Sequence, residues 1–168
     1  MNDKIRVLLS EEEVAKRIKE MGDVISSDYE GRPLHLICIL KGGVFFTCEL
    51  AKRISLPLTL DFMSVSSYGA GTVSSGIVKI VKDLDEPIEG KDVLIVEDII
   101  DSGNTLSYLI EVLKQRNPRS IELCTLLDKP ERRVKKQVTV KYTCFTVPDQ
   151  FIVGYGLDYD QKYRNLPY

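Results

Sequence analysis

Three carboxylates and a run of small polar residues follow one short apolar stretch of the sequence. Glu97 and Asp98 come directly after the apolar residues 93–96, and Asp101 precedes the segment 102–105, which is Ser-Gly-Asn-Thr. Small residues let backbone N–H groups wrap closely around an anion such as a phosphate. Carboxylates would repel that phosphate, so we expect them to face sugar hydroxyls, a metal ion or a reacting nitrogen. The stretch is therefore predicted to bind a sugar phosphate.

A strand and a helix are expected to hold these groups in place. Residues 93–96 form a short apolar run bounded by turn signals, which is typical of a strand in a sheet covered on both faces. Apolar residues then recur at helical spacing, at Leu106, Leu109, Ile110 and Leu113. The start of such a helix offers unpaired N–H groups and the positive end of the helix dipole to a phosphate. The sequence thus predicts a strand, an acidic loop, a phosphate-binding turn and a helix, in that order.

The turn has residues that suit this role. Gly103 permits a positive φ, and the hydroxyls of Ser102 and Thr105 can donate to a phosphate. The alternative is an ordinary strand-to-helix connection, in which Asp101 merely caps a helix that begins near Asn104. Three ordered acidic residues exceed what capping requires, so the phosphate-binding interpretation is favoured.

A second strand-turn-helix segment lies earlier in the chain. Residues 34–40 are predicted to form a buried strand, and residues 44–54 are predicted to form a helix. Lys41, Gly42 and Gly43 connect the two. Glycines at such a connection can form a second anion site, although a plain tight turn fits the three residues equally well.

Two further segments are of interest. Residues 56–65 and 77–81 are expected to pair as a hairpin, with the polar, glycine-rich connection 66–72 as its mobile tip. Lys129 follows a predicted strand at 121–127, at the edge where open α/β sheets bind ligands. The run 131–136 holds four basic residues and is expected to be a solvated face.

The composition limits the class of protein. The chain has 168 residues, of which 43% are hydrophobic and 29% are charged, and this suits one globular domain with a full core. The net charge of −2 argues against nucleic-acid binding. No apolar run approaches the roughly 20 residues of a membrane span. The four cysteines show no CxxC spacing, so we expect reduced thiols in a cytoplasmic protein.

The segment 93–105, VLIVEDIIDSGNT, resembles the ribose-phosphate-binding motif of purine phosphoribosyltransferases of the hypoxanthine-guanine type. The motif is long and ordered, and the resemblance covers nearly the whole chain. It implies the type I fold, an α/β domain whose mostly parallel central sheet is flanked by helices. A small hood built by the chain ends would cover the carboxyl edge of the sheet. Residues 1–168 would form a single domain, with its core at about 30–145 and its hood made from the N-terminal segment and about 146–168.

The resemblance also implies the residues of the site. The ribose phosphate would be held by Glu97, Asp98, Asp101, Ser102, Gly103, Asn104 and Thr105. Pyrophosphate would be bound by Lys41, Gly42 and Arg164. The family often has a non-proline cis peptide in its Leu-Lys-Gly-Gly segment, and the sequence leaves open whether the Lys41–Gly42 peptide is cis. The purine would be bound by Lys129, Phe151, Ile152 and Asp158, and a lid would contain Ser67 and Tyr68. A Mg²⁺ cofactor would be held by Glu97, Asp98 and Asp158.

Four of these residues would have specific roles toward the base. Asp101 would be the catalytic residue and would exchange a proton with purine N7. Lys129 would donate to the 6-oxo group. Phe151 would stack on the purine ring, and the backbone of Ile152 would pair with its edge.

The implied enzyme is a pentosyltransferase of purine salvage. It would transfer the 5-phosphoribosyl group from phosphoribosyl pyrophosphate to N9 of hypoxanthine or guanine, giving IMP or GMP and pyrophosphate, as a homodimer or homotetramer. The alternative from another class is a nucleotide-sensing regulator on the same fold that binds RNA or DNA. Such a regulator need not keep a base-binding lysine, a stacking aromatic residue and a lid together, as this sequence does. A pyrimidine transferase is a third alternative, against which Lys129 and Phe151 argue.

Overall fold

The computed structural model describes residues 5–67, 78–134 and 138–168 of the chain. Their helices and strands, in chain order, are α1 (Glu11–Asp28), β1 (Leu34–Leu40), α2 (Val44–Ala51), β2 (Leu58–Ser67), β3 (Val78–Lys82), β4 (Asp92–Ile100), α3 (Asn104–Lys114), β5 (Ser120–Asp128), the 3₁₀ helix η1 (Pro130–Arg132) and β6 (Tyr142–Thr146). The strands form one sheet of order β3-β2-β1-β4-β5-β6. All neighbours pair in parallel except β2 and β3. The prediction of an α/β fold with a mostly parallel sheet is confirmed.

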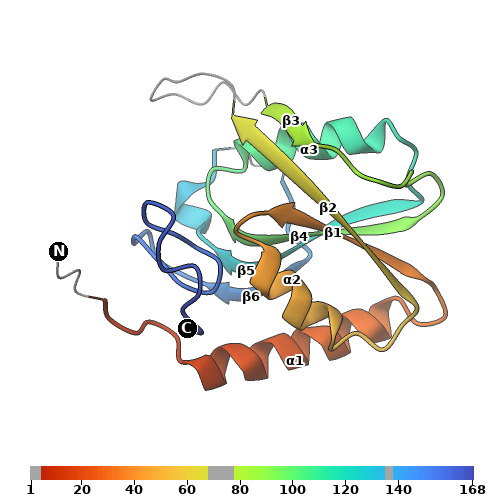
Figure 1. Cartoon of the computed structure of the whole chain (residues 1–168). Coiled ribbons are helices and arrows are strands. Elements are labelled where there is room, and N and C mark those ends of the chain that lie inside the picture. Colours follow the sequence, from red (N-terminus) through yellow and green to blue (C-terminus); the bar gives the residue numbers. More distant parts are fainter. Residues whose placement is uncertain (1–4, 68–77, 135–137) are drawn as a thin grey trace.

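The sheet is covered by helices on both faces (Figure 1). Alternate residues of β1 and β4 enter two separate hydrophobic clusters, since side chains on a strand point to opposite faces in turn. Leu36 and Leu94 belong to the cluster that includes residues of α1 and α2. Ile37 and Ile95 belong to the cluster that includes residues of α3. Burial on both faces explains why the two strands are continuous apolar runs.

The strand order reverses direction between β1 and β4. From β1 the chain passes through α2 to β2 on one side, and from β4 it passes through α3 to β5 on the other. The two connections therefore diverge at the carboxyl ends of adjacent strands and leave a crevice between them, which is where open α/β sheets bind ligands. Residues 41–43 and 101–103, which sequence analysis identified as possible anion sites, are these two connections.

The acidic residues after residue 96 are not in a loop, as the sequence suggested, but in the last part of β4. β4 pairs with β1 only as far as Val96, yet it pairs with β5 as far as Ile100. Pairing with β5 alone extends β4 beyond Val96. On the side of β1, the backbone at Glu97 and Asp98 has no strand partner and faces the crevice. The sequence pattern missed this because polar residues interrupt the apolar run while the ladder continues.

The predicted hairpin of β2 and β3 is confirmed as an antiparallel pair. The predicted tip at 66–72 lies outside the described residues from 68 onward. At the carboxyl end of the chain, the described tail forms no regular strand. Residues 147–168 make only isolated bridges, Gly154 with Leu157 and Tyr159 with Lys162, whereas β6, which the sequence analysis did not predict, precedes them.

The N-terminal segment and the tail lie at the same end of the molecule (Figure 1). Residues 5–8 face residues 150–163 across a cavity. The division into a core and a hood built by the chain ends, with the boundaries given above, stays a prediction. Helix α1 begins at a capping box made by Ser10 and Glu13. Its apolar face, at Val14, Ile18, Met21 and Ile25, packs into the same cluster as β1 and α2.

Two neighbouring phenylalanines of α2 test the packing beneath the crevice. Phe46 is fully buried, whereas the side chain of Phe45 is 44% exposed. We expect Phe46→Ala to lower the free energy of unfolding by about 3–5 kcal/mol, because it removes transfer energy and leaves a cavity. Phe45→Ala, the matched control, should cost less than about 1 kcal/mol. Urea titration followed by circular dichroism measures both, and equal losses would contradict the packing described.

Candidate active site

The turn after β4 has the geometry that the sequence predicted for an anion site. Gly103 has φ of 81° and is the N-cap of α3, and no side chain caps that helix. Ser102 Oγ accepts a hydrogen bond of 3.3 Å from the N–H of Asn104. The alternative in which Asp101 caps α3 is therefore wrong. Its side chain is 48% exposed and contributes to the cavity described below.

Glu97 and Asp98 form a partly buried acidic pair in the crevice. Burial raises the pKa of Glu97 well above its usual value, and the adjacent Asp98 carboxylate raises it further. Burial also raises the pKa of Asp98, while hydrogen bonds from the Glu97 side chain and from the N–H of Ile99 oppose that rise. The raised pKa of both groups reflects the cost of holding two negative charges side by side in a partly buried place.

The connection after β1 lies directly over this pair. The cis peptide bond of this segment is Leu40–Lys41, one bond before the Lys41–Gly42 bond that the sequence left open. Gly42 packs so closely on Asp98 that a Cβ atom at residue 42 would overlap Asp98 Oδ2. The backbone N–H of Gly43 donates to Ile39 O over 3.1 Å. Glycine at position 42 is thus required by the close approach of the loop to the acidic pair.

The tail covers the same loop from the other side. Gly156, with φ of 102°, packs against the Gly42 carbonyl so closely that a Cβ atom at 156 would overlap it. Arg164 Nη1 donates to Gly156 O over 2.6 Å, and Arg164 Nη2 lies 3.4 Å from Asp158 Oδ1. Lys41 Nζ donates to Gln161 Oε1 over 3.4 Å. Three segments distant in sequence therefore meet in one stack, in the order tail, Lys41–Gly42 loop and acidic pair.

A cavity of about 210 Å³ opens beside this stack. Its lining comes from β4, the following turn, the end of β5 and the tail, and consists of Asp98, Ile99, Asp101, Lys129, Phe151, Ile152, Leu157 and Asp158. The structure therefore brings Asp98 and Asp101 together with the four residues that the resemblance assigned to the purine. Residues 102–105 of the assigned ribose-phosphate set do not line this cavity. Four other assigned residues do not line the cavity but contact residues that do or lie next to them, namely Glu97, Lys41, Gly42 and Arg164.

The lining of this cavity includes a buried cation and an exposed ring. Lys129 is only 8% exposed, and its backbone N–H donates to Ile100 O over 3.0 Å. Phe151 is 75% exposed and meets the ring of Tyr159 edge to face, with centroids 5.8 Å apart and an interplanar angle of 88°. The exposed part of the Phe151 ring is therefore available to stack on an aromatic ligand.

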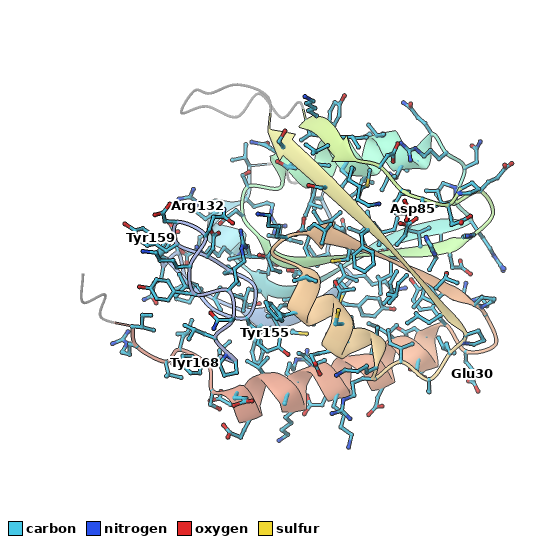
Figure 2. The ribbon with its side chains drawn as sticks, viewed as in Figure 1. Glu30, Asp85, Arg132, Tyr155, Tyr159 and Tyr168 are labelled. Atoms are coloured by element: carbon cyan, nitrogen blue, oxygen red, sulfur yellow. The ribbon has the colours of Figure 1, made fainter. Side chains whose placement is uncertain are left out.

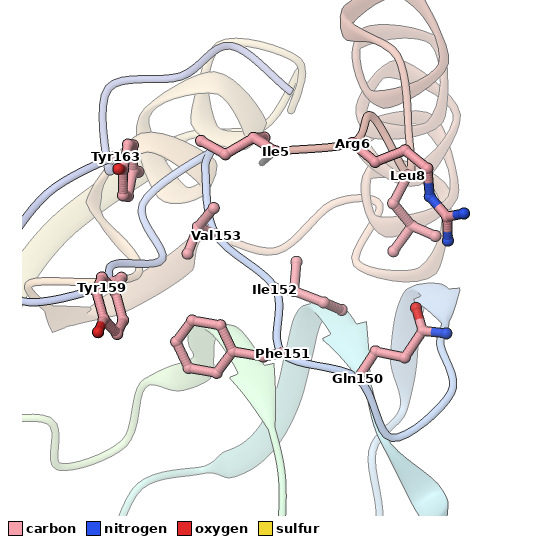
Figure 3. Close-up of a pocket in the computed structure, with 9 residues that line it drawn as sticks. All are labelled: Ile5, Arg6, Leu8, Gln150, Phe151, Ile152, Val153, Tyr159 and Tyr163. Atoms are coloured by element: carbon pink, nitrogen blue, oxygen red, sulfur yellow. The ribbon is translucent and has the colours of Figure 1, made fainter. Parts of the chain in front are cut away.

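A larger cavity of about 430 Å³ shares Phe151 and Ile152 with the smaller one (Figure 3). In Figure 3, Ile5, Arg6 and Leu8 of the N-terminal segment face Phe151 and Ile152 of the tail. Among the described residues that line it there is no carboxylate and no lysine, so this part of the lining lacks groups that could hold a ribose or exchange a proton. We therefore assign the chemistry to the smaller cavity.

Two arginines at the end of η1, Arg132 and Arg133, were missed by sequence analysis, which expected the run 131–136 to be solvated. Arg133 is largely buried and forms an ion pair with Asp128, so that expectation is wrong at this position. Arg132 Nε lies 3.9 Å from Asp101 Oδ1, and Arg132 Nη1 lies 3.7 Å from Asp149 Oδ2. Figure 2 shows Arg132 at the same end of the molecule as Tyr159, whereas Asp85 and Glu30 lie at the opposite end. Only the fold brings the arginines to the site, so no sequence spacing could have indicated them.

The structure describes the predicted lid and the predicted metal site less fully. Tyr68 of the predicted lid lies outside the described residues, and for Ser67 only the backbone at the end of β2 is described. Among the described residues, no group of three His, Cys, Asp or Glu side chains is arranged to hold a metal ion. The acidic pair still suits a divalent cation, because a cation would relieve the repulsion between two adjacent carboxylates and carboxylate oxygens are suitable ligands for it. A magnesium ion there would need substrate oxygens as further ligands.

Residues 7–160 match the family described as the phosphoribosyl transferase domain. The chain belongs to the phosphoribosyltransferase family. A solved hypoxanthine phosphoribosyltransferase from Staphylococcus aureus superimposes on this phosphoribosyltransferase with a TM-score of 0.96 at 51% identity, covering 99% of this chain and 90% of that one. The resemblance seen in the segment 93–105 is thereby confirmed at the level of the family and of the fold.

Curated relatives are similar over nearly the whole of this phosphoribosyltransferase chain. The hypoxanthine-guanine phosphoribosyltransferase of Bacillus subtilis is 54% identical over 163 residues, which are 97% of this chain and 90% of that protein. A bifunctional protein TilS/HprT of Listeria monocytogenes is 53% identical over 99% of this chain. The chain spans only 26% of the length of that bifunctional protein.

Two general properties of this phosphoribosyltransferase complete the description. Within residues 5–67, 78–134 and 138–168, no helix combines the length and apolar character needed to cross a membrane. All four cysteines are free thiols, and burial raises the pKa of Cys38 to about 11 and of Cys144 to about 12. These two buried thiols are therefore protonated at neutral pH and unreactive.

The acidic pair predicts a pH dependence of stability. A carboxyl whose pKa is higher in the folded than in the unfolded chain contributes stability below its unfolded pKa, about 4, and loses it as pH rises through the folded pKa. We therefore expect the effect of Glu97→Gln on the free energy of unfolding of the ligand-free protein to be more favourable at pH 7 than at pH 4. The difference should be about 1.4 kcal/mol for each unit by which folding raises the pKa of Glu97.

Urea unfolding of the ligand-free protein at several pH values between 4 and 8 measures this effect. Glu89→Gln, at an exposed position, is the control and should change stability equally at all of them. If Glu97→Gln changes the free energy of unfolding equally at pH 7 and pH 4, folding does not raise the pKa of Glu97.

Proposed function

We propose that this protein transfers the 5-phosphoribosyl group from phosphoribosyl pyrophosphate to N9 of hypoxanthine or guanine. The products are IMP or GMP and pyrophosphate, and the reaction belongs to purine salvage. The observation that carries the proposal is one cavity at the reversal of strand order, lined by carboxylates, a buried lysine and an exposed phenylalanine. It is supported by relatives of nearly equal length named hypoxanthine-guanine phosphoribosyltransferase.

In this proposal, the 5′-phosphate of the ribose binds in the turn Asp101–Thr105. Backbone N–H groups at the start of α3 and the positive end of its dipole favour an anion there. The hydroxyls of Ser102 and Thr105 add donors, and Asn104 continues the turn into the helix. Glu97 and Asp98 accept hydrogen bonds from the ribose hydroxyls, which suits their place in the floor of the crevice.

The pyrophosphate leaves toward the Lys41–Gly42 loop. Lys41 and Arg164 supply positive charge, and Arg164 is held in place by Gly156 O and Asp158. Glu97, Asp98 and Asp158 would hold a Mg²⁺ ion together with substrate oxygens. When bound, that ion neutralises charge that develops on the leaving group. The Ser67–Tyr68 lid is part of the proposal as a shield against water.

The base lies between Lys129 and Phe151. A lysine ammonium can only donate hydrogen bonds, so Lys129 favours a purine with an oxygen at position 6. The exposed ring of Phe151 stacks on the purine. Asp101 lines the same cavity and exchanges a proton with N7 as N9 attacks the ribose.

The assembly and the location stay predictions. We expect a homodimer or a homotetramer. We expect it to be located in the cytoplasm, because the buried thiols are reduced. The alternative of a regulator that binds RNA or DNA gains no support, because the similar proteins compared above carry enzyme names.

A transfer assay with a panel of bases tests the proposal. With phosphoribosyl pyrophosphate and Mg²⁺, we expect pyrophosphate release with hypoxanthine and guanine and none with uracil. Lys129→Ala should lower kcat/KM for both oxopurines by roughly 10-fold or more, since a charged hydrogen bond is lost, and adenine should be excluded less strongly. Absence of transfer with every base would refute the function, and unchanged oxopurine efficiency in the variant would refute only the role of Lys129.

Asp101→Asn tests the proton transfer. The variant keeps the size and hydrogen bonding of the side chain but loses the titratable proton, so kcat should fall roughly 10²–10⁴-fold. Binding of phosphoribosyl pyrophosphate should change little. Asp149→Asn is the matched control, because Asp149 also pairs with Arg132 but does not line the cavity. Single-turnover rates should be used, and near-normal rates in Asp101→Asn would leave Asp101 without a chemical role.

A further inference from the structure

Arg133 contacts the phosphate-binding turn from behind. Its Nε donates to the backbone carbonyl of Asp101 over 3.3 Å. Its Cδ atom lies 3.2 Å from the position that a Cβ atom on Gly103 would occupy, so the aliphatic stem packs against that glycine. Its Nη2 forms an ion pair with Asp128 at the end of β5, and both side chains are only 15% exposed. One side chain thus joins the turn after β4 to the strand that ends beside Lys129.

The neighbouring backbone reinforces this contact. We call residues 129–134 the backing segment. Its first residue, Lys129, donates its N–H to Ile100 O over 3.0 Å, and its last residue, Val134, donates its N–H to Ser102 O over 2.9 Å. Carbonyls 100, 101 and 102 are therefore all held by the backing segment, the middle one by the Arg133 side chain.

The direction of these carbonyls decides the direction of the N–H groups in the turn. In a planar trans peptide the C=O and the N–H of the next residue point in opposite directions. When Arg133 and Val134 hold the carbonyls of Asp101 and Ser102, the N–H groups of Ser102 and Gly103 are directed away from the backing segment. N–H groups fixed in advance bind an anion without a cost for ordering the loop.

We propose that Arg133 is a positioning residue that holds the phosphate-binding turn in its binding conformation. The proposal rests on the proposed function, because the phosphate is the 5′-phosphate of that substrate. Arg133 itself does not line the cavity and acts through the backbone of Asp101. It should therefore affect ligands that carry a phosphate and leave the base site unchanged.

Three variants separate positioning from stability. Arg133→Met removes both the ion pair and the hydrogen bond. Arg133→Lys keeps a positive charge opposite Asp128, but a single ammonium on a linear stem cannot also reproduce the guanidinium bond to Asp101 O. Arg116→Met is the matched control, because Arg116 forms a comparable pair with Asp83, at 2.8 and 2.9 Å, outside the site.

Binding of ribose 5-phosphate, measured by calorimetry without base or metal, is the first readout. We expect its dissociation constant to rise roughly 10-fold in Arg133→Met and at least about 3-fold in Arg133→Lys, as for loss of a charged hydrogen bond. Arg116→Met should bind it as the wild type does. Thermal unfolding should show that Arg133→Lys recovers most of the stability that Arg133→Met loses.

Kinetics of the full reaction are the second readout. In Arg133→Lys, the KM for phosphoribosyl pyrophosphate should rise several-fold while the KM for hypoxanthine changes by less than about 2-fold. Unchanged ribose 5-phosphate binding in a folded Arg133→Lys, or equal changes in both KM values, would overturn the positioning role. If the wild type binds ribose 5-phosphate but transfers to no base, the proposed function fails while the inference about Arg133 is still decided by binding.

Discussion

The parallel pairing of β1 with β4 is the contact on which the site depends. The pairing ends at Val96, and beyond it the chain leaves β1 toward one side of the sheet and β4 toward the other. No other neighbouring pair of parallel strands in the described sheet has connections that diverge in this way. Because β4 continues along β5 to Ile100, its acidic residues are presented in the crevice on a rigid strand rather than on a loop. The same extension sets where the phosphate-binding turn begins.

Close backbone packing then fixes the depth of the crevice. Gly42 rests on Asp98, and Gly156 rests on Gly42, at distances that leave no space for a side chain on either glycine. The loop after β1 can therefore move only if the acidic pair or the tail moves with it. Burial of two carboxyls has a cost in the ligand-free state, which their raised pKa values record. A cation or ribose hydroxyls can relieve that cost, so the strain favours ligand binding.

The sequence by itself determined the elements and the chemistry of the central motif. Apolar runs and helical spacing indicated β1, β4, β5 and α3, because local periodicity reflects which faces are buried. Gly103 was identified as a residue that permits a positive φ, and in the structure it adopts one. The length and order of the segment 93–105 identified the family before any distance was known. Lys129 could be placed at the edge of the sheet because it follows an apolar strand.

Only the tertiary structure decided how these segments meet. The boundary of β4 depends on a ladder with β5, a partner 28 residues further along at Asp92–Ser120, so residues 97–100 could not be assigned from their own pattern. The irregular tail takes its shape from Gly42 and Arg164 contacts, not from a strand periodicity. Arg133 looked like part of a solvated basic run until Asp128 and the carbonyl of Asp101 were seen beside it. Such contacts join residues through space, and spacing along the chain carries no record of them.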